Sequence, residues 1–284
     1  MTEPLDAERF KQDQQRDWDA AAAGWKKWWP LFERSAQHVS DRLVDLAAVK
    51  AGDRVLDIAT GNGEPAVTAA RRVGPSGRVI ATDQSAGMLA IGRERAAAVG
   101  LHNIEFLQSD AEQLGVDGAF DAALCRWGLM FMPDLTGALK RIRAHLKPGA
   151  RFATAVWSTP DKVPMITLGA DAVRRLAKLP PPPPNALDPL RLADTSILQS
   201  ALQEAGFHDV VIERMQVVWE MASPADFAEF RRDVAAPFRA LLERQTPEMR
   251  DQIIAAVTDA ARAYAAADGK VRTANETILF CAAN

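Results

Sequence analysis

The chain has 284 residues, of which 48% are hydrophobic and 25% charged, and its formal net charge is −3. This length suffices for one large domain with appended elements, and the near-neutral charge provides no field to hold nucleic acid or anionic lipid. No stretch reaches the roughly 20 apolar residues of a membrane span, and residues 1–15 lack the apolar run of a secretion signal. We therefore expect a cytoplasmic globular protein without a nucleic-acid partner. Four histidines without close spacing predict no metal site.

Residues 1–50 have a helical pattern and contain Trp18, Trp25, Trp28 and Trp29. We expect them to form an N-terminal helical cap. The spacing of the last three tryptophans is typical of a helix packed on a sheet. The alternative is an aromatic lid over a planar acceptor, for which Trp25 and Trp29 are the candidates.

Residues 51–160 alternate between short β-branched runs and helical patterns, which predicts βαβ units around a parallel sheet. Strands this apolar must be covered on both faces, so we expect a doubly wound α/β sheet. Ser85 is a candidate helix N-cap, and Lys147-Pro148-Gly149 is a predicted helix stop. The predicted strands are 54–58, 78–82, 104–108, 120–126 and 151–157, and the predicted helices are 64–72, 86–99 and 134–146.

Residues 161–284 are expected to complete the sheet with strands at 210–218 and 276–282, and to add helical insertions that form an acceptor lid. A short helix is followed by Pro180 to Pro184, a run that favours an extended polyproline conformation. The segment 222–269 is helical in pattern, with a second helix that starts at Thr246-Pro247 and that Gly269 can end. These segments are expected over the carboxyl edge of the sheet, where α/β proteins bind ligands. The proline run and the late helices are candidates for a homodimer contact.

A glycine loop joins the first predicted strand to the first helix of the sheet, in the sequence VLDIATGNGEPA at 55–66. Gly61 allows a tight turn, and Gly63 lets a ligand approach the backbone. The loop is not specific alone, because Gly-x-Gly-x-x-Ala also satisfies the dinucleotide fingerprint. An NAD(P)-dependent oxidoreductase is therefore the alternative.

Acidic residues at successive strand ends make the interpretation more specific. Asp83 ends the second strand about 22 residues after Gly61, where an acid accepts from both hydroxyls of an adenosine ribose. Asp110 follows the third strand and is placed to accept from the adenine amine, and Met88 is placed to pack on the base. Asp57 would repel a pyrophosphate but suits the sulfonium and ammonium cations of S-adenosylmethionine. The sign of the charge favours the methyl donor.

These stretches resemble the class I S-adenosylmethionine-dependent methyltransferases, and more narrowly the small-molecule group that includes the ubiquinone and menaquinone C-methyltransferases. The resemblance covers about 45–160 in the family's order and spacing. The matching pieces are VLDIATGNG (55–63), VIATDQSAGML (79–89), FLQSDAEQL (106–114), FDAALCRWGLMFMPD (120–134) and LKPGARFATAVW (146–157).

The resemblance implies a mostly parallel seven-stranded sheet with an antiparallel last strand, and S-adenosylmethionine as cofactor. Two features depart from the family. Ala59 stands where many members have glycine, and we expect its methyl to crowd the loop without abolishing binding. A long helical excursion also separates the last two strands. The expected cofactor contacts are Asp57, Ala59, Gly61, Gly63, Asp83, Gln84, Met88, Asp110, Ala111 and Arg126.

The expected reaction is an in-line methyl transfer to a small, mostly apolar acceptor, with aromatic ones among the candidates. For this reaction the protein aligns the reactants and excludes water. Arg126 is a candidate to orient the acceptor, although it could instead pair with Asp134 or Glu112. His38, on a helix before the first strand, is the candidate general base.

The expected acceptor contacts are Trp25, Trp29, Trp127, Met130 and Phe131, with core packing as the alternative for Met130 and Phe131. A further alternative is a non-catalytic S-adenosylmethionine-binding protein of the same fold.

Overall fold

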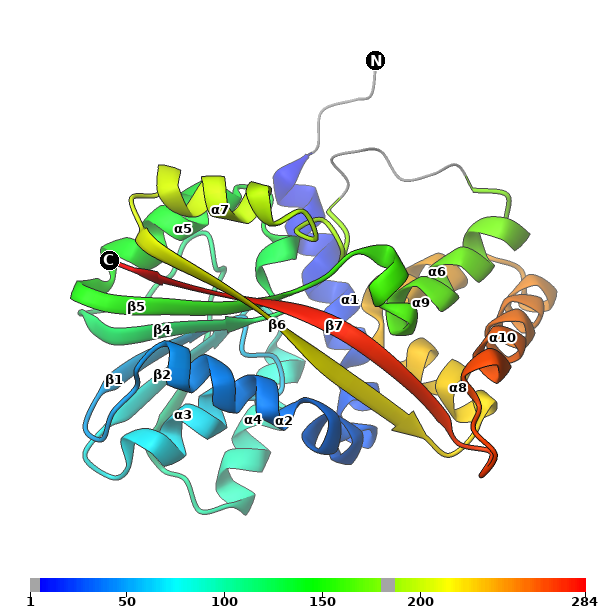
Figure 1. The fold of residues 1–284 in the computed structure, drawn as a ribbon, viewed down its shortest axis with the longest axis horizontal. Coiled ribbons are helices and arrows are strands. Elements are labelled where there is room, and N and C mark those ends of the chain that lie inside the picture. The colour runs from blue at the N-terminus through cyan, green and yellow to red at the C-terminus, as the bar shows by residue number, and fades with distance from the viewer. Residues whose placement is uncertain (1–5, 180–186) are drawn as a thin grey trace.

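The computed structural model describes residues 6–179 and 187–284. Seven strands form one sheet in the order β3-β2-β1-β4-β5-β7-β6, and β7 runs antiparallel to both of its neighbours (Figure 1). The predicted fold class, including the antiparallel last strand, is therefore confirmed. The strands are β1 (Arg54–Ile58), β2 (Arg78–Asp83), β3 (Ile104–Gln108), β4 (Phe120–Arg126), β5 (Leu146–Trp157), β6 (His208–Met221) and β7 (Val271–Ala283).

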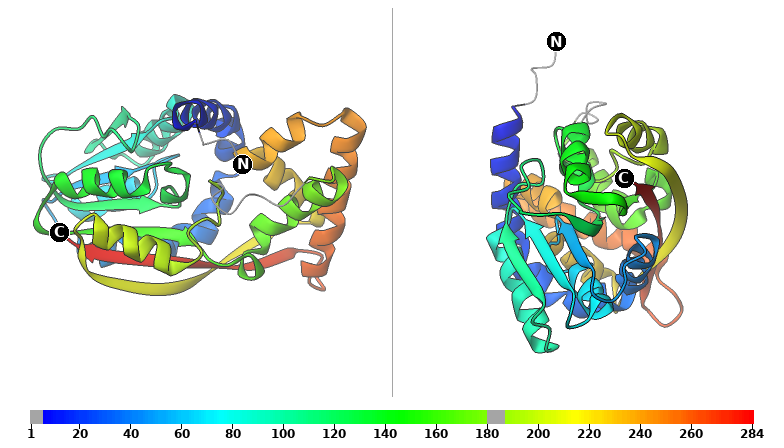
Figure 2. Two further views of the ribbon diagram at one scale, coloured as in Figure 1. Left: turned by 90° about the horizontal axis from the view of Figure 1, so that it is seen from above. Right: turned by 90° about the vertical axis from the view of Figure 1, so that its left-hand side faces the viewer.

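Helices cover both faces of the sheet, with α2, α3 and α4 on one face and α5 and α7 on the other (Figures 1 and 2). The helix α1 stands beside the carboxyl ends of the parallel strands. The helices are α1 (Ala7–Lys27), α2 (Trp29–Leu46), α3 (Ala66–Val73), α4 (Ala86–Ala98), α5 (Leu135–Ala144), α6 (Pro164–Leu176), α7 (Thr195–Glu204), α8 (Pro224–Val234), α9 (Ala236–Glu243) and α10 (Pro247–Ala261), with 3-10 turns at Leu129–Phe131, Pro160–Lys162 and Arg262–Tyr264.

Local capping explains where several helices begin. The Ser85 side chain accepts from the Met88 N–H at 3.1 Å, as predicted, and Thr246 does the same for the Met249 N–H at 3.3 Å at the start of α10. The first N–H groups of a helix have no carbonyl partner within the helix, so a side-chain oxygen of the residue that precedes the helix stabilises its first turn. Asp134 caps α5 by accepting from the Gly137 N–H at 2.9 Å.

Three sequence predictions need correction. The stop at residues 147–149 lies inside β5, because the pairing jumps from Phe120–Leu146 to Ala122–Arg151 and residues 147–150 bulge out. Gly269 does not end α10, which stops at Ala261; the glycine N–H instead closes a turn to the Ala266 carbonyl at 2.9 Å, just before β7. The helix α7 was not predicted. The proline run at 180–184 lies outside the described residues.

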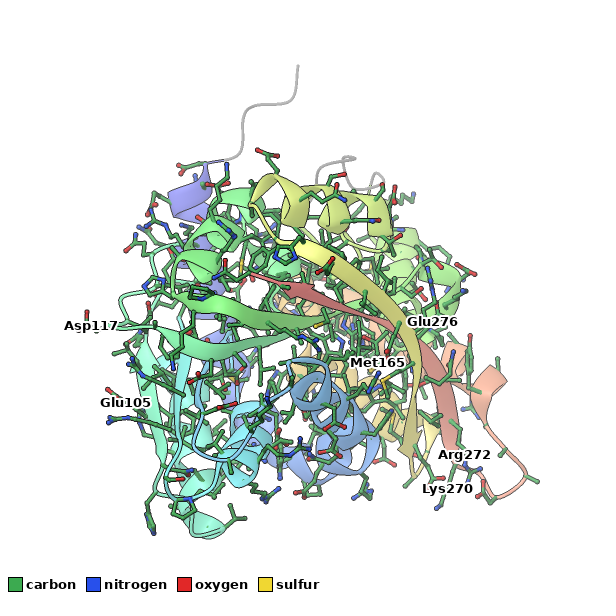
Figure 3. All side chains as sticks on the ribbon, turned by 60° about the vertical axis from the view of Figure 1, so that its left-hand side comes forward. Glu105, Asp117, Met165, Lys270, Arg272 and Glu276 are labelled. Atoms are coloured by element: carbon green, nitrogen blue, oxygen red, sulfur yellow. The ribbon has the colours of Figure 1, made fainter. Side chains whose placement is uncertain are left out.

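The strands β6 and β7 extend well beyond the rest of the sheet and carry a second group of helices at their far end (Figure 1). We call α6, α8, α9 and α10 the distal helices. Figure 3 shows Lys270 and Arg272 at this outer end of β7, on the opposite side of the molecule from Glu105 and Asp117. Both cations bind Glu220 of β6, at 2.7 Å each. In the described part of the chain, no helix is long and apolar enough to cross a membrane.

Candidate cofactor and acceptor site

A cavity opens at the carboxyl ends of β1 to β4, under α1, with an empty volume of about 910 Å³ that includes the space at its mouth. Because the carboxyl ends of parallel strands lie at the same edge, residues far apart in the chain meet there. The site residues predicted from the sequence that line this cavity fall into two groups. The predicted cofactor residues in the wall are Ala59, Gly61, Asp83, Gln84, Met88, Asp110, Ala111 and Arg126, and the predicted acceptor residues in the wall are Trp25, Trp127 and Phe131.

The glycine loop turns sharply through positive φ angles, +53° at Ala59, +55° at Gly61 and +97° at Gly63. A Cβ on Gly61 would lie 3.4 Å from Met88 Cε, so the glycine keeps the wall open beside that side chain. Gly63 is not in the wall, and a Cβ there would lie 3.1 Å from the Gly92 Cα of α4. Its position therefore indicates helix packing rather than ligand approach.

Asp83 is held by two backbone donors at the end of β2. Its carboxylate accepts from the Gly61 N–H at 2.8 Å and the Ser85 N–H at 2.9 Å. Burial raises the pKa of Asp83 to about 6, against the effect of these hydrogen bonds. A carboxylate has about four acceptor positions, so two remain for hydroxyl donors in the cavity.

Asp110 forms a charged cluster with a residue that the sequence patterns did not single out. Lys11 of α1 lies 2.8 Å from Asp110 Oδ2 and 2.5 Å from Glu112 Oε2. The other Asp110 oxygen accepts from the Glu112 N–H at 2.8 Å, and Glu112 also accepts from the Asp134 N–H at 2.7 Å. The lysine thus joins α1 to the loop after β3. No motif could have identified it, because only the fold brings α1 to this loop.

Asp57 lies beneath the glycine loop and is fully buried. Its Oδ2 accepts from the Ala66 N–H at 2.9 Å, whereas Oδ1 has no hydrogen-bond partner in residues 6–179 and 187–284. Burial raises the pKa of Asp57 to about 8. Among the described residues, Thr60 Oγ1 and Asn62 Nδ2, in the wall of the cavity, also have no partner within hydrogen-bond geometry, although the Thr60 hydroxyl is near enough to Asp57 to oppose the rise of its pKa. Unpartnered buried polar atoms beside a cavity fit a polar ligand that completes the bonding, and an acid among them fits a cationic one.

Two buried charges of opposite sign form the floor of the cavity. Arg126 donates to the Ser40 hydroxyl at 2.8 Å, not to Asp134 or Glu112, so the pairing considered from the sequence is wrong. Burial lowers the pKa of Arg126, while Glu64 and Asp57 act against this shift. Glu64, which the sequence patterns did not single out, is 3% exposed and accepts from the Thr68 hydroxyl at 2.7 Å.

Aromatic side chains form the opposite wall. Trp18 of α1 lies edge-on to Phe131 and Trp25, with ring centroids 5.6 Å and 6.1 Å away. Trp127 stacks on Trp157 at 4.3 Å, and its indole N–H donates to the Thr277 hydroxyl at 2.9 Å. The rings are thereby fixed on α1 and on the segment after β4.

Three predicted site residues lie elsewhere. His38 is exposed on α2, with Nε2 2.9 Å from the Gln216 carbonyl oxygen of β6. Trp29 packs under the Arg95 guanidinium, which lies 2.9 Å from its ring centroid. Met130 is fully buried in the core, which is the alternative that the sequence left open. None of the three lines the cavity.

Comparison with known proteins supports the methyltransferase family that the sequence motifs resemble. The model of the ubiE/COQ5 methyltransferase family matches residues 35–168. The ubiquinone/menaquinone biosynthesis C-methyltransferase UbiE of Pseudomonas fluorescens (strain SBW25) is 31% identical over an alignment of 218 residues that covers 69% of this chain and 77% of that protein.

Two solved structures share the fold at low identity. Phosphoethanolamine N-methyltransferase 2 of Haemonchus contortus, bound to S-adenosyl-L-methionine, has a TM-score of 0.60 at 18% identity over 97% of this chain and 60% of its own. The YcgJ protein of Bacillus subtilis has a TM-score of 0.55 at 19% identity over 87% of this chain and 98% of its own. These two indicate the fold alone. Because the similarity to UbiE extends over 77% of that enzyme, the chain belongs to the UbiE/COQ5 family of S-adenosylmethionine-dependent methyltransferases.

Proposed function

We propose that the protein methylates a small, mostly apolar acceptor, aromatic ones included, inside the cavity under α1. The observation that carries this proposal is that one cavity joins the acidic strand ends to an aromatic wall. The acids suit the adenosyl cofactor, and the rings suit an apolar partner brought against it. Family membership removes the NAD(P)-dependent alternative.

The cofactor contacts in this proposal follow from the free acceptor positions. Asp83 would take the ribose hydroxyls, Asp110 the adenine amine, and Met88 would pack on the base, with Gln84 and Ala111 beside them. Gly61 and Ala59 would contact the ligand through their backbone atoms. Asp57 is the buried acid beneath the loop; it is protonated below about pH 8 without ligand, and it would ionise against the cationic end of the bound ligand, through Thr60 and Asn62.

The proposed roles of the acceptor residues are positioning and exclusion of water. When bound, S-adenosylmethionine supplies a methyl group that is already activated on a sulfonium. Trp18, Trp25 and Phe131 would hold the acceptor in a dry site, and Trp127 is fixed by its bond to Thr277. Arg126, rigidly held by Ser40, would orient a polar group of the acceptor. His38 is left out of this proposal because it is exposed on α2 and bonded to β6.

The test combines binding with turnover. Calorimetry should detect binding of S-adenosylmethionine and S-adenosylhomocysteine. The enzyme should methylate at least one compound in a panel of phenols, quinols and amines. An absence of heat with both ligands would contradict the cofactor site. Binding without turnover on any acceptor would favour the non-catalytic alternative.

Three coarser predictions from the sequence stay predictions. They are the division into a helical cap, a core and a lid at residues 1–50, 51–160 and 161–284, the cytoplasmic location, and a homodimer. Light scattering on the purified chain tests the last of these, because a monomeric mass at micromolar concentration would contradict it.

A further inference from the structure

Arg231 of α8 is a buried cation among the distal helices. It is 6% exposed, and its Nε has no hydrogen-bond partner among the described residues. Within the same residues no acid pairs with it, and burial alone lowers its pKa to about 10. An isolated buried charge costs several kcal/mol, so such groups are normally paired or bound to a ligand.

Three of the distal helices meet around this guanidinium. A Cβ on Gly169 of α6 would lie 3.6 Å from Arg231 Nε and 3.3 Å from the ring of Phe238 of α9. The Phe238 ring centroid lies 5.9 Å from the guanidinium carbon. Phe227 and Phe230, on the same helix, are fully buried. The surroundings are therefore apolar, and among the described residues the face of Phe238 offers the charge only weak cation–π compensation.

A second buried donor without a partner lies in the same region. Trp219 of β6 is fully buried, and its Nε1 has no acceptor among the described residues. Its ring packs on Phe230 at 5.5 Å. The neighbouring Asn275 of β7 is already occupied, because its Oδ1 accepts from the Met165 N–H at 2.8 Å where α6 docks on β7 (Figure 3). The distal helices and the adjoining part of β6 thus contain two donors without a described partner, and a ligand that complements them must supply acceptors.

The cavity wall is connected directly to the helix that carries Arg231. Trp25 lines the cavity, and its indole N–H donates to the Val234 carbonyl at 2.9 Å. Val234 follows Arg231 by three residues, which is about 4.5 Å along a helix axis. Arg231 does not itself line the cavity, but one hydrogen bond separates the wall residue Trp25 from the last turn of the helix that carries it.

We propose that Arg231 binds an oxyanion of the methyl acceptor, a carboxylate or a phosphate, so that the acceptor combines an apolar body with an anionic end. This inference rests on the proposed function. Guanidinium binds both oxyanions through paired hydrogen bonds, and these are strongest where water is excluded. The pairing would also replace the interaction that the buried charge lacks. The anionic end would then fix the orientation of the acceptor relative to the aromatic wall.

The test measures binding of three probes to the full chain by calorimetry, with S-adenosylhomocysteine at saturation and constant ionic strength. The probes are benzoate, inorganic phosphate and the neutral benzyl alcohol. We expect one of the anions to bind the wild type more tightly than benzyl alcohol, and the anion that does so identifies the carboxylate or the phosphate. Arg231→Met should weaken that anion by about tenfold or more and leave benzyl alcohol unchanged. Arg232→Met, on the exposed side of α8, is the matched control and should retain anion binding.

Two results would overturn the inference. One is equal affinity of wild type and Arg231→Met for both anions, and the other is a wild type that binds neither anion more tightly than benzyl alcohol. The second result needs no variant and holds even if Arg231→Met fails to fold. Binding of S-adenosylhomocysteine, measured separately on each variant, identifies a failure of the proposed function, and in that case the anion series is repeated without it.

Discussion

The cofactor edge of the sheet contains buried acids, whereas the distal helices contain a buried arginine. At the edge, Asp57 and Asp83 have raised pKa values because burial outweighs their hydrogen bonds. Among the distal helices, burial lowers the pKa of Arg231, and no described acid opposes the shift. Each region therefore keeps an ionisable group whose charged form the fold alone does not stabilise. The sign of each charge indicates a ligand of opposite sign, a cationic cofactor at one end and an anionic group at the other.

The two regions also differ in how they are built. The acids at the edge are held by backbone N–H groups of the loops that follow β1 and β2. Arg231 is surrounded by residues of its own helix α8, of the following helix α9, and of α6, which is distant in sequence. A substitution at the edge should therefore affect one ligand contact, whereas one among the distal helices should also alter packing.

The largest effect is expected for Asp83→Asn, which removes the anion at the end of β2. Losing charge-assisted bonds to two hydroxyls should weaken S-adenosylmethionine about 100-fold by calorimetry. Asp161→Asn, an exposed acid after β5, is the control and should bind as the wild type does. An unchanged dissociation constant for Asp83→Asn would contradict the assignment of the cofactor to this edge of the sheet.

A smaller loss is expected for Arg126→Met on the floor of the cavity. Removing the group that orients the acceptor should lower kcat/KM for an identified acceptor about tenfold to 100-fold. Glu64 and Asp57 would then lose the positive charge of Arg126, although Glu64 keeps its pair with Arg95 at 3.5 Å, so the dissociation constant of S-adenosylhomocysteine should be measured in parallel. Arg175→Met, exposed on α6, is the control. Equal turnover in Arg126→Met and wild type would contradict the orienting role.

The third prediction concerns the pH dependence of stability and Asp57. A carboxyl with a folded-state pKa of about 8 keeps its proton in the native state between about pH 4 and 8, whereas the unfolded chain loses it. The wild type without ligand should therefore lose stability as pH rises through this window. The stability of Asp57→Asn should not fall over this pH range. Its free energy of unfolding should exceed that of the wild type by about 2 to 3 kcal/mol at pH 8 and differ little from it at pH 4.

Thermal or urea unfolding at several pH values measures this effect. A variant that is less stable than wild type at pH 8 would show that Asp57 stabilises the fold, and would break the parallel between Asp57 and Arg231. Cofactor affinity should fall in the same variant, because asparagine cannot ionise when the cationic ligand binds.

The smallest effect is expected at Ala59, whose φ of +53° is unfavourable for a residue with a Cβ. Ala59→Gly should stabilise the protein by about 0.5–1 kcal/mol by relieving this backbone strain. The same change at the exposed Ala97 of α4 should destabilise by about 1 kcal/mol, because glycine is a poor helix former. Urea unfolding of both variants measures the contrast. A change in the free energy of unfolding of the same sign in both variants would argue against backbone strain in the loop.

Sequence patterns predicted the edge well because its signals are local. β1, β3 and β4 have the predicted bounds, since each is a short apolar run followed by a loop or turn. The glycine loop and the acids at strand ends stand at fixed distances along the chain, so Asp83 and Asp110 could be placed without tertiary information. The outer half of β7 was missed because its buried positions include Thr273 and Asn275, which do not read as an apolar strand.

The remaining residues depend on tertiary contacts that no spacing reveals. Lys11 and Trp18 reach the cavity only because α1 crosses the strand ends. Arg126 bonds to Ser40 of α2 instead of the acids considered from the sequence. Arg231 looked like one more helical arginine, and only its position among α6, α8 and α9 distinguishes it from Arg232 beside it.

A crystal structure of the complex with S-adenosylhomocysteine tests the central claim most directly. The account predicts ribose hydroxyls within hydrogen-bond distance of Asp83, the adenine amine at Asp110, and Met88 against the base. An adenosyl group bound away from these three side chains, with Asp57 unchanged beneath an empty loop, would contradict it.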